Sequence, residues 1–122
     1  MSAPLAYAFV GLGHLGANLA ACLLRGGFEV VVFDRNPEAI QRLVTMGAIA
    51  ASSPANAAAG AGNSITCLPS PKVSEAVLAG PEGLLSGLPK GGTWIEMSTN
   101  GRDEILSLAD IAAEAGIYTL EC

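Results

Sequence analysis

The sequence predicts an α/β fold, a three-layer αβα arrangement in which helices cover both faces of a doubly wound parallel sheet of about six strands. Short apolar strands alternate with helical segments along all 122 residues, and the links between them are short. Hydrophobic residues make up 51% of the chain and charged residues 14%, a balance typical of a folded domain. Most of the apolar mass is Ala, Val, Leu and Ile, which suits helices packed closely on a parallel sheet.

Six runs of apolar or β-branched residues predict the strands. The second run, EVVVF, is apolar on both faces, which predicts a strand in the middle of the sheet. The sixth run reaches Glu121, so we expect the chain to end inside or directly after a strand. The strands are expected at residues 5–10, 29–33, 49–50, 63–68, 93–97 and 117–121.

Capping signals predict where the helices begin, and glycines predict where they end. Asn36-Pro37 and Ser53-Pro54 each place a capping side chain before a proline in the first helical turn. Asn100 is expected to cap the last helix. The helices are expected from the glycine-rich turn to Arg25, over about 37–46, from Pro54 onward, over about 72–78 and over about 102–115, with a Gly/Pro-punctuated link at 80–92.

Charge and composition argue against several classes of partner. The net charge is −5, and the six Lys and Arg residues are too scattered to form a basic stripe, so nucleic acid is not expected to bind. The sequence shows no signal peptide and no run approaching the roughly 20 apolar residues of a membrane span. Cys22, Cys67 and Cys122 have neither disulfide nor metal-ligand spacing. We therefore expect a cytoplasmic protein with no membrane partner and no metal site.

Gly11-x-Gly13-x-x-Gly16 lies between the first strand and the first helix. In a Rossmann-type sheet, glycines at these positions permit a tight turn, let the backbone approach a pyrophosphate and bring the helix against the strand. The helix start adds free N–H groups and a partial positive charge. The pattern predicts a dinucleotide site, and the alternative is a turn that binds nothing. His14 lies inside this turn, and we expect its side chain to face solvent rather than to act as a general base.

Asp34 stands at the end of the second strand, 18 residues after Gly16. A carboxylate at this place accepts hydrogen bonds from the ribose hydroxyls of adenosine. Because its charge repels a 2′-phosphate, Asp34 favours NAD as the cofactor, whereas the neighbouring Arg35 guanidinium leaves NADP open. The alternative is a solvated Asp-Arg pair in a turn.

Two further loops are expected at the same edge of the sheet. Leu68-Pro69 ends the fourth strand and Ser98-Thr99-Asn100 follows the fifth, and open α/β sheets bind ligands at the carboxyl ends of their strands. Helix capping would explain Thr99 and Asn100 equally well.

This ordered set of segments resembles the β-hydroxyacid dehydrogenase family, the group of 3-hydroxyisobutyrate dehydrogenase, tartronate semialdehyde reductase and 6-phosphogluconate dehydrogenase. The family's opening signature is similar to FVGLGHLGANLAACLLRGGFEVVVFDRNPE. Its stretch from the fourth strand to the Ser-Thr loop resembles CLPSPKVSEAVLAGPEGLLSGLPKGGTWIEMST, and the start of the segment before its substrate loop resembles TLEC. The resemblance covers essentially the whole chain.

The resemblance implies roles for individual residues. Leu15 stands where the family usually has methionine, and Gly101-Arg102 stands where a proline is common. The implied cofactor site comprises Gly11, Leu12, Gly13, His14, Leu15 and Gly16 around the pyrophosphate, Asp34 and Arg35 at the adenosine ribose, Leu68 and Pro69 beside the cofactor, and Thr99 near the nicotinamide, with Ser98 at the edge of the substrate pocket.

The resemblance also implies hydride transfer between a nicotinamide cofactor and a small β-hydroxyacid such as 3-hydroxyisobutyrate, with a lysine as general acid or base. In the family that lysine, the substrate loop and a helical second domain lie further along the chain, so no catalytic residue is assigned. We expect residues 1–122 to form one dinucleotide-binding domain, without the second domain, that binds cofactor without turnover and forms a homo-oligomer. The alternatives are a non-catalytic nucleotide-binding or assembly module and the cofactor domain of an imine or pyrroline-carboxylate type reductase.

Overall fold

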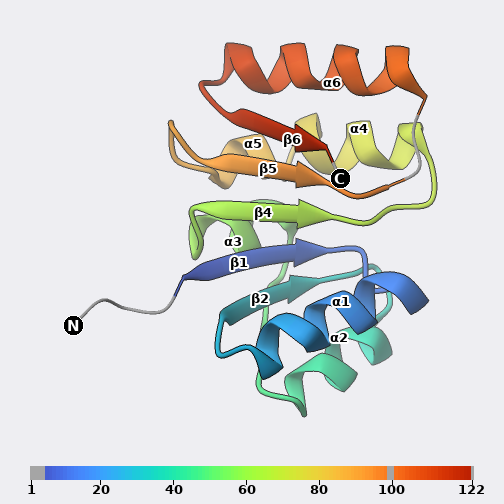
Figure 1. The fold of residues 1–122 in the computed structure, drawn as a ribbon, viewed down its shortest axis with the longest axis vertical. Coiled ribbons are helices and arrows are strands. Elements are labelled where there is room, and N and C mark those ends of the chain that lie inside the picture. Colours follow the sequence, from blue (N-terminus) through green and yellow to red (C-terminus); the bar gives the residue numbers. More distant parts are fainter. Residues whose placement is uncertain (1–4, 99–100, 122) are drawn as a thin grey trace.

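A parallel sheet of six strands forms the middle layer of the protein (Figure 1). The computed structural model describes residues 5–98 and 101–121. The strands lie in the order β3-β2-β1-β4-β5-β6, and every neighbouring pair is parallel. The predicted fold class is confirmed. The strands are β1 (Ala6–Val10), β2 (Glu29–Phe33), β3 (Ile49–Ala50), β4 (Asn63–Thr66), β5 (Thr93–Glu96) and β6 (Tyr118–Glu121).

The direction in which strands are added reverses at β1. From β1 the chain runs outward through β2 to β3, and it then returns to β4 and runs outward the other way through β5 to β6. The carboxyl ends of β1 and β4 therefore lie where the two halves of the sheet part. Open α/β sheets leave a crevice for a ligand at this point.

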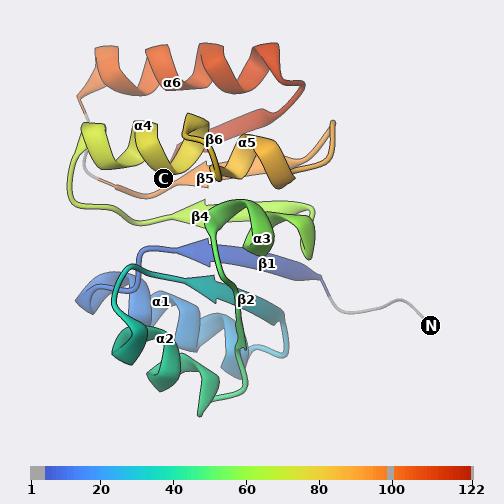
Figure 2. The same cartoon turned by 180° about the vertical axis from the view of Figure 1, so that it is seen from behind.

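Helices cover both faces of the sheet. α1 and α2 lie in front of β1 and β2 in Figure 1, whereas α3, α4 and α5 lie on the opposite face, which Figure 2 brings forward. α6 lies beside β6 and contributes to the same apolar cluster as α4 and α5. Among the described residues, no helix combines the length and the apolar character that a membrane crossing requires. The helices are α1 (His14–Arg25), α2 (Pro37–Val44), α3 (Pro54–Ala59), α4 (Pro71–Ala79), α5 (Leu84–Gly87) and α6 (Arg102–Glu114).

Alternation along the strands divides most of the core into two clusters. Phe9 packs with residues of α1 and α2, and the next residue, Val10, packs with residues of α3 to α6. Trp94, the largest fully buried side chain, belongs to the second cluster. Because helices cover β2 on both sides, Val30, Val31 and Val32 are all buried, as the run EVVVF predicts.

Most element boundaries lie within one residue of the prediction, and the ends of α2 and β4 differ from it by two residues. α2 ends at Val44 rather than near Met46, because the N–H of Met46 bonds to the carbonyl of Leu43, only three residues back. β4 ends at Thr66 rather than at Leu68, because the N–H of Leu68 bonds to a side chain instead of to a neighbouring strand. Both differences shorten an element by two residues and leave the topology unchanged.

The predicted link at 80–92 contains a short helix, α5. Four residues make too short an apolar pattern to be recognised in a sequence, and α5 is held by packing, since Leu84 is fully buried. The start of α6 also differs from the prediction. Its N-cap is Gly101, not Asn100, and Asn100 itself lies outside the described residues.

β5 and β6 leave apolar side chains exposed. Of the described elements, none lies in front of these two strands in Figure 1, because α1 and α2 cover only the neighbouring half of that face. Leu120 pairs in register with Ile95, whose side chain lies on this face, and Tyr118 pairs with Thr93. Tyr118 is 70% exposed and Leu120 is 55% exposed. An apolar strip of this kind is typical of a contact surface.

Candidate functional site

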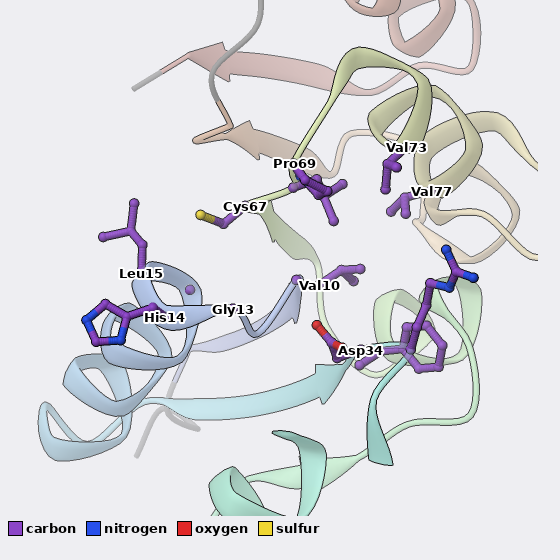
Figure 3. Close-up of a pocket in the computed structure, with 14 residues that line it drawn as sticks. Val10, Gly13, His14, Leu15, Asp34, Cys67, Pro69, Val73 and Val77 are labelled. Carbon is purple, nitrogen blue, oxygen red and sulfur yellow. The ribbon is translucent and has the colours of Figure 1, made fainter. Parts of the chain in front are cut away.

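A cleft of about 470 Å³ opens at the carboxyl ends of β1, β2 and β4 (Figure 3). Small-molecule sites typically have volumes of about 300–1,000 Å³. Most of the residues singled out in the sequence come together here, namely Gly11, Gly13, His14, Leu15, Gly16, Asp34, Arg35, Leu68 and Pro69. The lining also includes Val10, Phe33, Cys67, Val73 and Val77, which the sequence did not single out.

The structure requires glycine to a different extent at each of the three positions of the motif. Gly11 has a positive φ of 101°, and a Cβ there would collide with the carbonyl of Cys67. A Cβ on Gly16 would collide with the carbonyl of Gly11, so Gly16 allows α1 to lie directly against the turn. A Cβ on Gly13 would have no heavy atom within 4 Å. The fold therefore requires glycine at the first and third positions but not at the second.

The start of α1 carries none of the groups that usually satisfy a helix N-terminus. Its N-cap is Gly13, which offers no side-chain hydrogen bond, and the first turn contains no acidic residue. By contrast, Asn36 caps α2 through its side chain, with Glu38 in the first turn. The first N–H groups of a helix have no intrahelical partner and attract an anion. The lining of the cleft includes this helix start, and His14 within it is exposed, as expected. Figure 3 shows the His14 ring on the outer side of the turn, away from Asp34.

The Asp34 carboxylate is held by the backbone on both sides. Oδ2 accepts from the N–H of Leu12 over 2.7 Å, and Oδ1 accepts from the N–H of Asn36 over 2.8 Å. Each carboxylate oxygen has two acceptor positions, so both can accept a further hydrogen bond. Leu12 takes part through its N–H, because its side chain is 4% exposed and packs in the core rather than lining the cleft. These two bonds fix the position of the carboxylate at the mouth of the cleft.

An apolar wall faces the glycine turn. Val73 and Val77 lie one turn apart on α4, and Figure 3 shows both across the cleft from Gly13. Val10 and Phe33, the last residues of β1 and β2, complete the apolar surface between them. A mostly apolar lining with a few fixed polar groups is the usual composition of a cofactor site.

Ser98 lies behind the cleft wall rather than in its lining. Its Oγ accepts from the N–H of Leu68 over 2.6 Å, and its own N–H donates to Glu96 Oε1 over 2.8 Å. The loop after β5 is thereby tied to the loop after β4. Thr99, which the resemblance places near the nicotinamide, lies outside the described residues.

Among the residues that the structure describes, Cys67 is the one thiol in the cleft lining. Burial, followed by the negative charge of Glu96, raises the pKa of the Cys67 thiol above its ordinary value. A raised pKa keeps the sulfur protonated near neutral pH, which is the opposite of what an activated nucleophile needs. Cys67 therefore contributes surface to the cleft and no nucleophile.

Comparison with known proteins agrees with this geometry. Residues 6–122 match the family described as the NAD binding domain of 6-phosphogluconate dehydrogenase. The 3-sulfolactaldehyde reductase of Escherichia coli (strain K12) is 44% identical over 94 residues, which are 77% of this chain and 32% of the reductase. The chain thus spans about a third of the length of this relative.

Solved structures show the same relationship. The 3-hydroxyisobutyrate dehydrogenase of Mycobacterium tuberculosis, solved with L-serine, matches with a TM-score of 0.90 and 27% identity over 98% of this chain and 40% of that one. An imine reductase from Pseudomonas sp. matches with a TM-score of 0.84 and 27% identity, over 98% of this chain and 41% of that one.

The family match, which covers almost the entire chain, agrees with the strand order and with the cleft at the strand reversal. The chain belongs to the family of the NAD binding domain of 6-phosphogluconate dehydrogenase, and it shares its fold with the matching part of the solved 3-hydroxyisobutyrate dehydrogenase.

Proposed function

We propose that this chain holds NAD(H) in the cleft for an oxidoreductase that moves a hydride between the nicotinamide and a small β-hydroxyacid such as 3-hydroxyisobutyrate. The observation that carries the proposal is the start of α1, which has no capping side chain and no acidic residue and whose N-cap, Gly13, has open space above it. Those are the features that a pyrophosphate needs in order to reach the helix N-terminus. The bound cofactor supplies the hydride, and the chain binds and orients it.

Each element of the cleft has a part in this proposal. The turn from Gly11 to Gly16 holds the pyrophosphate through backbone N–H groups, with Leu12, His14 and Leu15 as its intervening residues. The ribose of adenosine lies at Asp34 and Arg35. Leu68 and Pro69 flank the cofactor and Ser98 stands at the edge of the substrate pocket, and the resemblance assigns Thr99 to the nicotinamide.

Asp34 makes NAD the preferred cofactor over NADP. Its carboxylate is fixed by the two backbone bonds from Leu12 and Asn36 and so remains at the ribose position. A 2′-phosphate placed there would meet a like charge that cannot swing away. Arg35, which also lines the cleft, is the residue that would offset this repulsion if NADP were bound.

Calorimetric titration of the chain with NADH and, separately, with NADPH tests the proposal. We expect NADH to bind at least about tenfold more tightly, a difference of about 1.4 kcal/mol. Tighter binding of NADPH would keep the site and assign the choice of cofactor to Arg35. If neither nucleotide bound at millimolar concentration, the glycine turn would be only a turn and the proposal would fail.

Two relatives support a small hydroxyacid or a related aldehyde as the substrate class. One solved neighbour is a 3-hydroxyisobutyrate dehydrogenase with L-serine, itself a β-hydroxyacid, and the reductase of E. coli acts on 3-sulfolactaldehyde by name. An imine reductase is the second candidate, because one of these enzymes shares the fold at a similar TM-score. Assays of the whole protein with 3-hydroxyisobutyrate, L-serine and a cyclic imine separate the two. A non-catalytic nucleotide-binding module would turn over none of them.

We also propose that the protein is a cytoplasmic homo-oligomer. The exposed side chains of Tyr118 and Leu120 on the edge strand support an apolar contact surface. Light scattering of the chain over a hundredfold range of concentration should show an average mass that rises above that of the monomer. Leu120→Lys should shift the distribution toward monomer, with Leu106→Lys on exposed α6 as a matched control that leaves it unchanged. A monomer at every concentration would contradict this proposal.

A further inference from the structure

A buried polar cluster lies behind the cleft, at the ends of β4 and β5. Thr66 and Glu96 are partners in the parallel register, and Trp94 precedes Glu96 by two residues on the same face of β5. Trp94 is 0% exposed, and Thr66 and Glu96 are each 1% exposed. These three residues could not be singled out in the sequence, because only the register of β4 against β5 brings them together.

The hydrogen bonds of the cluster run in one direction. Trp94 Nε1 donates to Thr66 Oγ1 over 2.9 Å, and Thr66 Oγ1 donates to Glu96 Oε1 over 2.9 Å. An indole nitrogen only donates and an ionised carboxylate only accepts, so the Thr66 hydroxyl accepts from Trp94 and donates its single proton to Glu96. Glu96 Oε1 also accepts from the N–H of Ser98 over 2.8 Å. The carboxylate is therefore the acceptor on which the buried cluster and the loop after β5 converge.

Ser98 connects this cluster to the cleft. Its Oγ accepts from the N–H of Leu68 over 2.6 Å, and Leu68 lines the cleft. Cys67 and Leu68 also lie against the glycine turn, because a Cβ on Gly11 would meet the Cys67 carbonyl and the Leu68 side chain. We call Cys67 and Leu68 the Leu68 wall. This wall lies between the turn proposed to bind pyrophosphate and the loop that Glu96 anchors.

A carboxylate is a costly residue to use for packing alone. Burial of a carboxylate costs several kcal/mol before hydrogen bonds offset it, so a buried carboxylate is weak evidence for a role in stability alone. An apolar side chain in its place would leave the N–H of Ser98 without its acceptor. The charge of Glu96 is also felt at the cleft wall, where it contributes to the raised pKa of Cys67. Glu96 therefore helps to fix the position of the Leu68 wall through Ser98.

We propose that Glu96 is a positioning residue for cofactor binding: through Ser98, its carboxylate fixes the Leu68 wall at the separation from the glycine turn that a dinucleotide requires. This inference rests on the proposed cofactor function. It concerns a residue that lies behind the cleft and does not line it.

Ser98→Ala removes the hydroxyl that accepts from the N–H of Leu68 and leaves the buried Glu96 carboxylate in place. We expect the Kd for NADH to rise about tenfold, because the N–H of Leu68 loses the acceptor that holds this segment in position. Amide exchange measured by NMR should become faster at Leu68 and stay unchanged at Ala20 in the buried part of α1. The melting temperature should change by only a few degrees.

Glu96→Ala and Glu96→Gln test the carboxylate itself. Gln retains an acceptor oxygen and nearly the same volume, so NADH affinity should stay within about threefold of wild type, whereas Ala should weaken it by about tenfold or more. Glu121→Gln, the register partner on β6 with an exposed side chain, removes the same charge and should bind NADH as wild type does. If Glu96→Ala does not fold, the Ser98→Ala result decides.

The outcomes separate this inference from the function on which it rests. A wild-type chain that binds neither NADH nor NADPH removes the cofactor function and this inference with it. A wild-type chain that binds NADH, together with Ser98→Ala and Glu96→Ala variants that bind it equally well, overturns the positioning role alone. Faster exchange at Leu68 with an unchanged Kd would also overturn it, because the wall would then move without consequence for binding.

Discussion

Gly13→Ala is expected to weaken NADH binding by at least tenfold, more than about 1.4 kcal/mol, and to leave the fold intact. The backbone at Gly13 has φ −64° and ψ −173°, which alanine adopts without strain, and a Cβ there would contact no protein atom within 4 Å. The added methyl group would instead occupy the space through which a phosphate approaches the start of α1. Unfolding free energy should change by less than about 1 kcal/mol, the cost of alanine at an N-cap. Calorimetry gives the affinity and a thermal melt gives the stability.

Gly62→Ala is the matched control. It is the same substitution at a position that also has open space around it, and it lies before β4, at the opposite edge of the sheet from the cleft. NADH binding should be unchanged in this variant. If Gly13→Ala bound NADH as tightly as Gly62→Ala does, no phosphate would approach the backbone at Gly13, and the turn would have only a structural role.

The motif could be recognised in the sequence, but the different roles of its glycines could not. Gly11-x-Gly13-x-x-Gly16 presents three glycines as equals, and only the structure shows that two of them meet backbone carbonyls. The fold does not require glycine at position 13, and the approach of a ligand would explain why Gly13 has no side chain. That difference favours the dinucleotide site over the turn that binds nothing.

The sequence predicted the layers and all six strands because the pattern is local. Apolar runs, proline-containing caps and terminating glycines mark the elements within a few residues, as at Asn36-Pro37, where Asn36 does accept from the N–H of Glu38. Two of the errors occur where an element depends on distant contacts. α5 exists because Leu84 is buried in the core, and Leu68 leaves the strand because Ser98, 30 residues later, takes its N–H.

The candidate site was only partly predictable for the same reason. Residues at strand ends and in the glycine turn could be found from position alone, and Asp34 and Arg35 do line the cleft. Val73 and Val77 were missed, because the face that α4 turns toward the glycine turn is set by the crossover from β4 to β5. The link from Glu96 through Ser98 to Leu68 needs the register of β4 against β5, which no single segment contains.

Gly16→Ala is expected to destabilise the fold by about 2 kcal/mol or more, even though alanine is the better helix former. In the first turn of α1, where Gly16 lies, alanine would be favoured over glycine by at most about 1 kcal/mol. The new methyl group, however, would collide with the carbonyl of Gly11 and reach the ring of Phe9 at 3.4 Å, and neither has room to move in the buried core. The helix must then shift away from β1, and overpacking of this kind costs about 1–3 kcal/mol or more. The collision outweighs the gain in helix propensity because a backbone carbonyl in a tight turn cannot yield as a flexible side chain can.

Thermal melts followed by circular dichroism measure this effect, and we expect a melting temperature lower by about 6–10 °C. Gly60→Ala is the control, because a Cβ at that helix end meets its neighbours at an ordinary 3.7 Å, so its melting temperature should fall by no more than about half as much. A Gly16→Ala variant as stable as wild type would mean that α1 is not held against the turn. The N–H groups at its start would then lack the fixed position that phosphate binding requires. The proposed role of Gly13 in phosphate binding would lose its structural support. The two substitutions together therefore separate the geometry that builds the helix start from the space that a ligand uses above it.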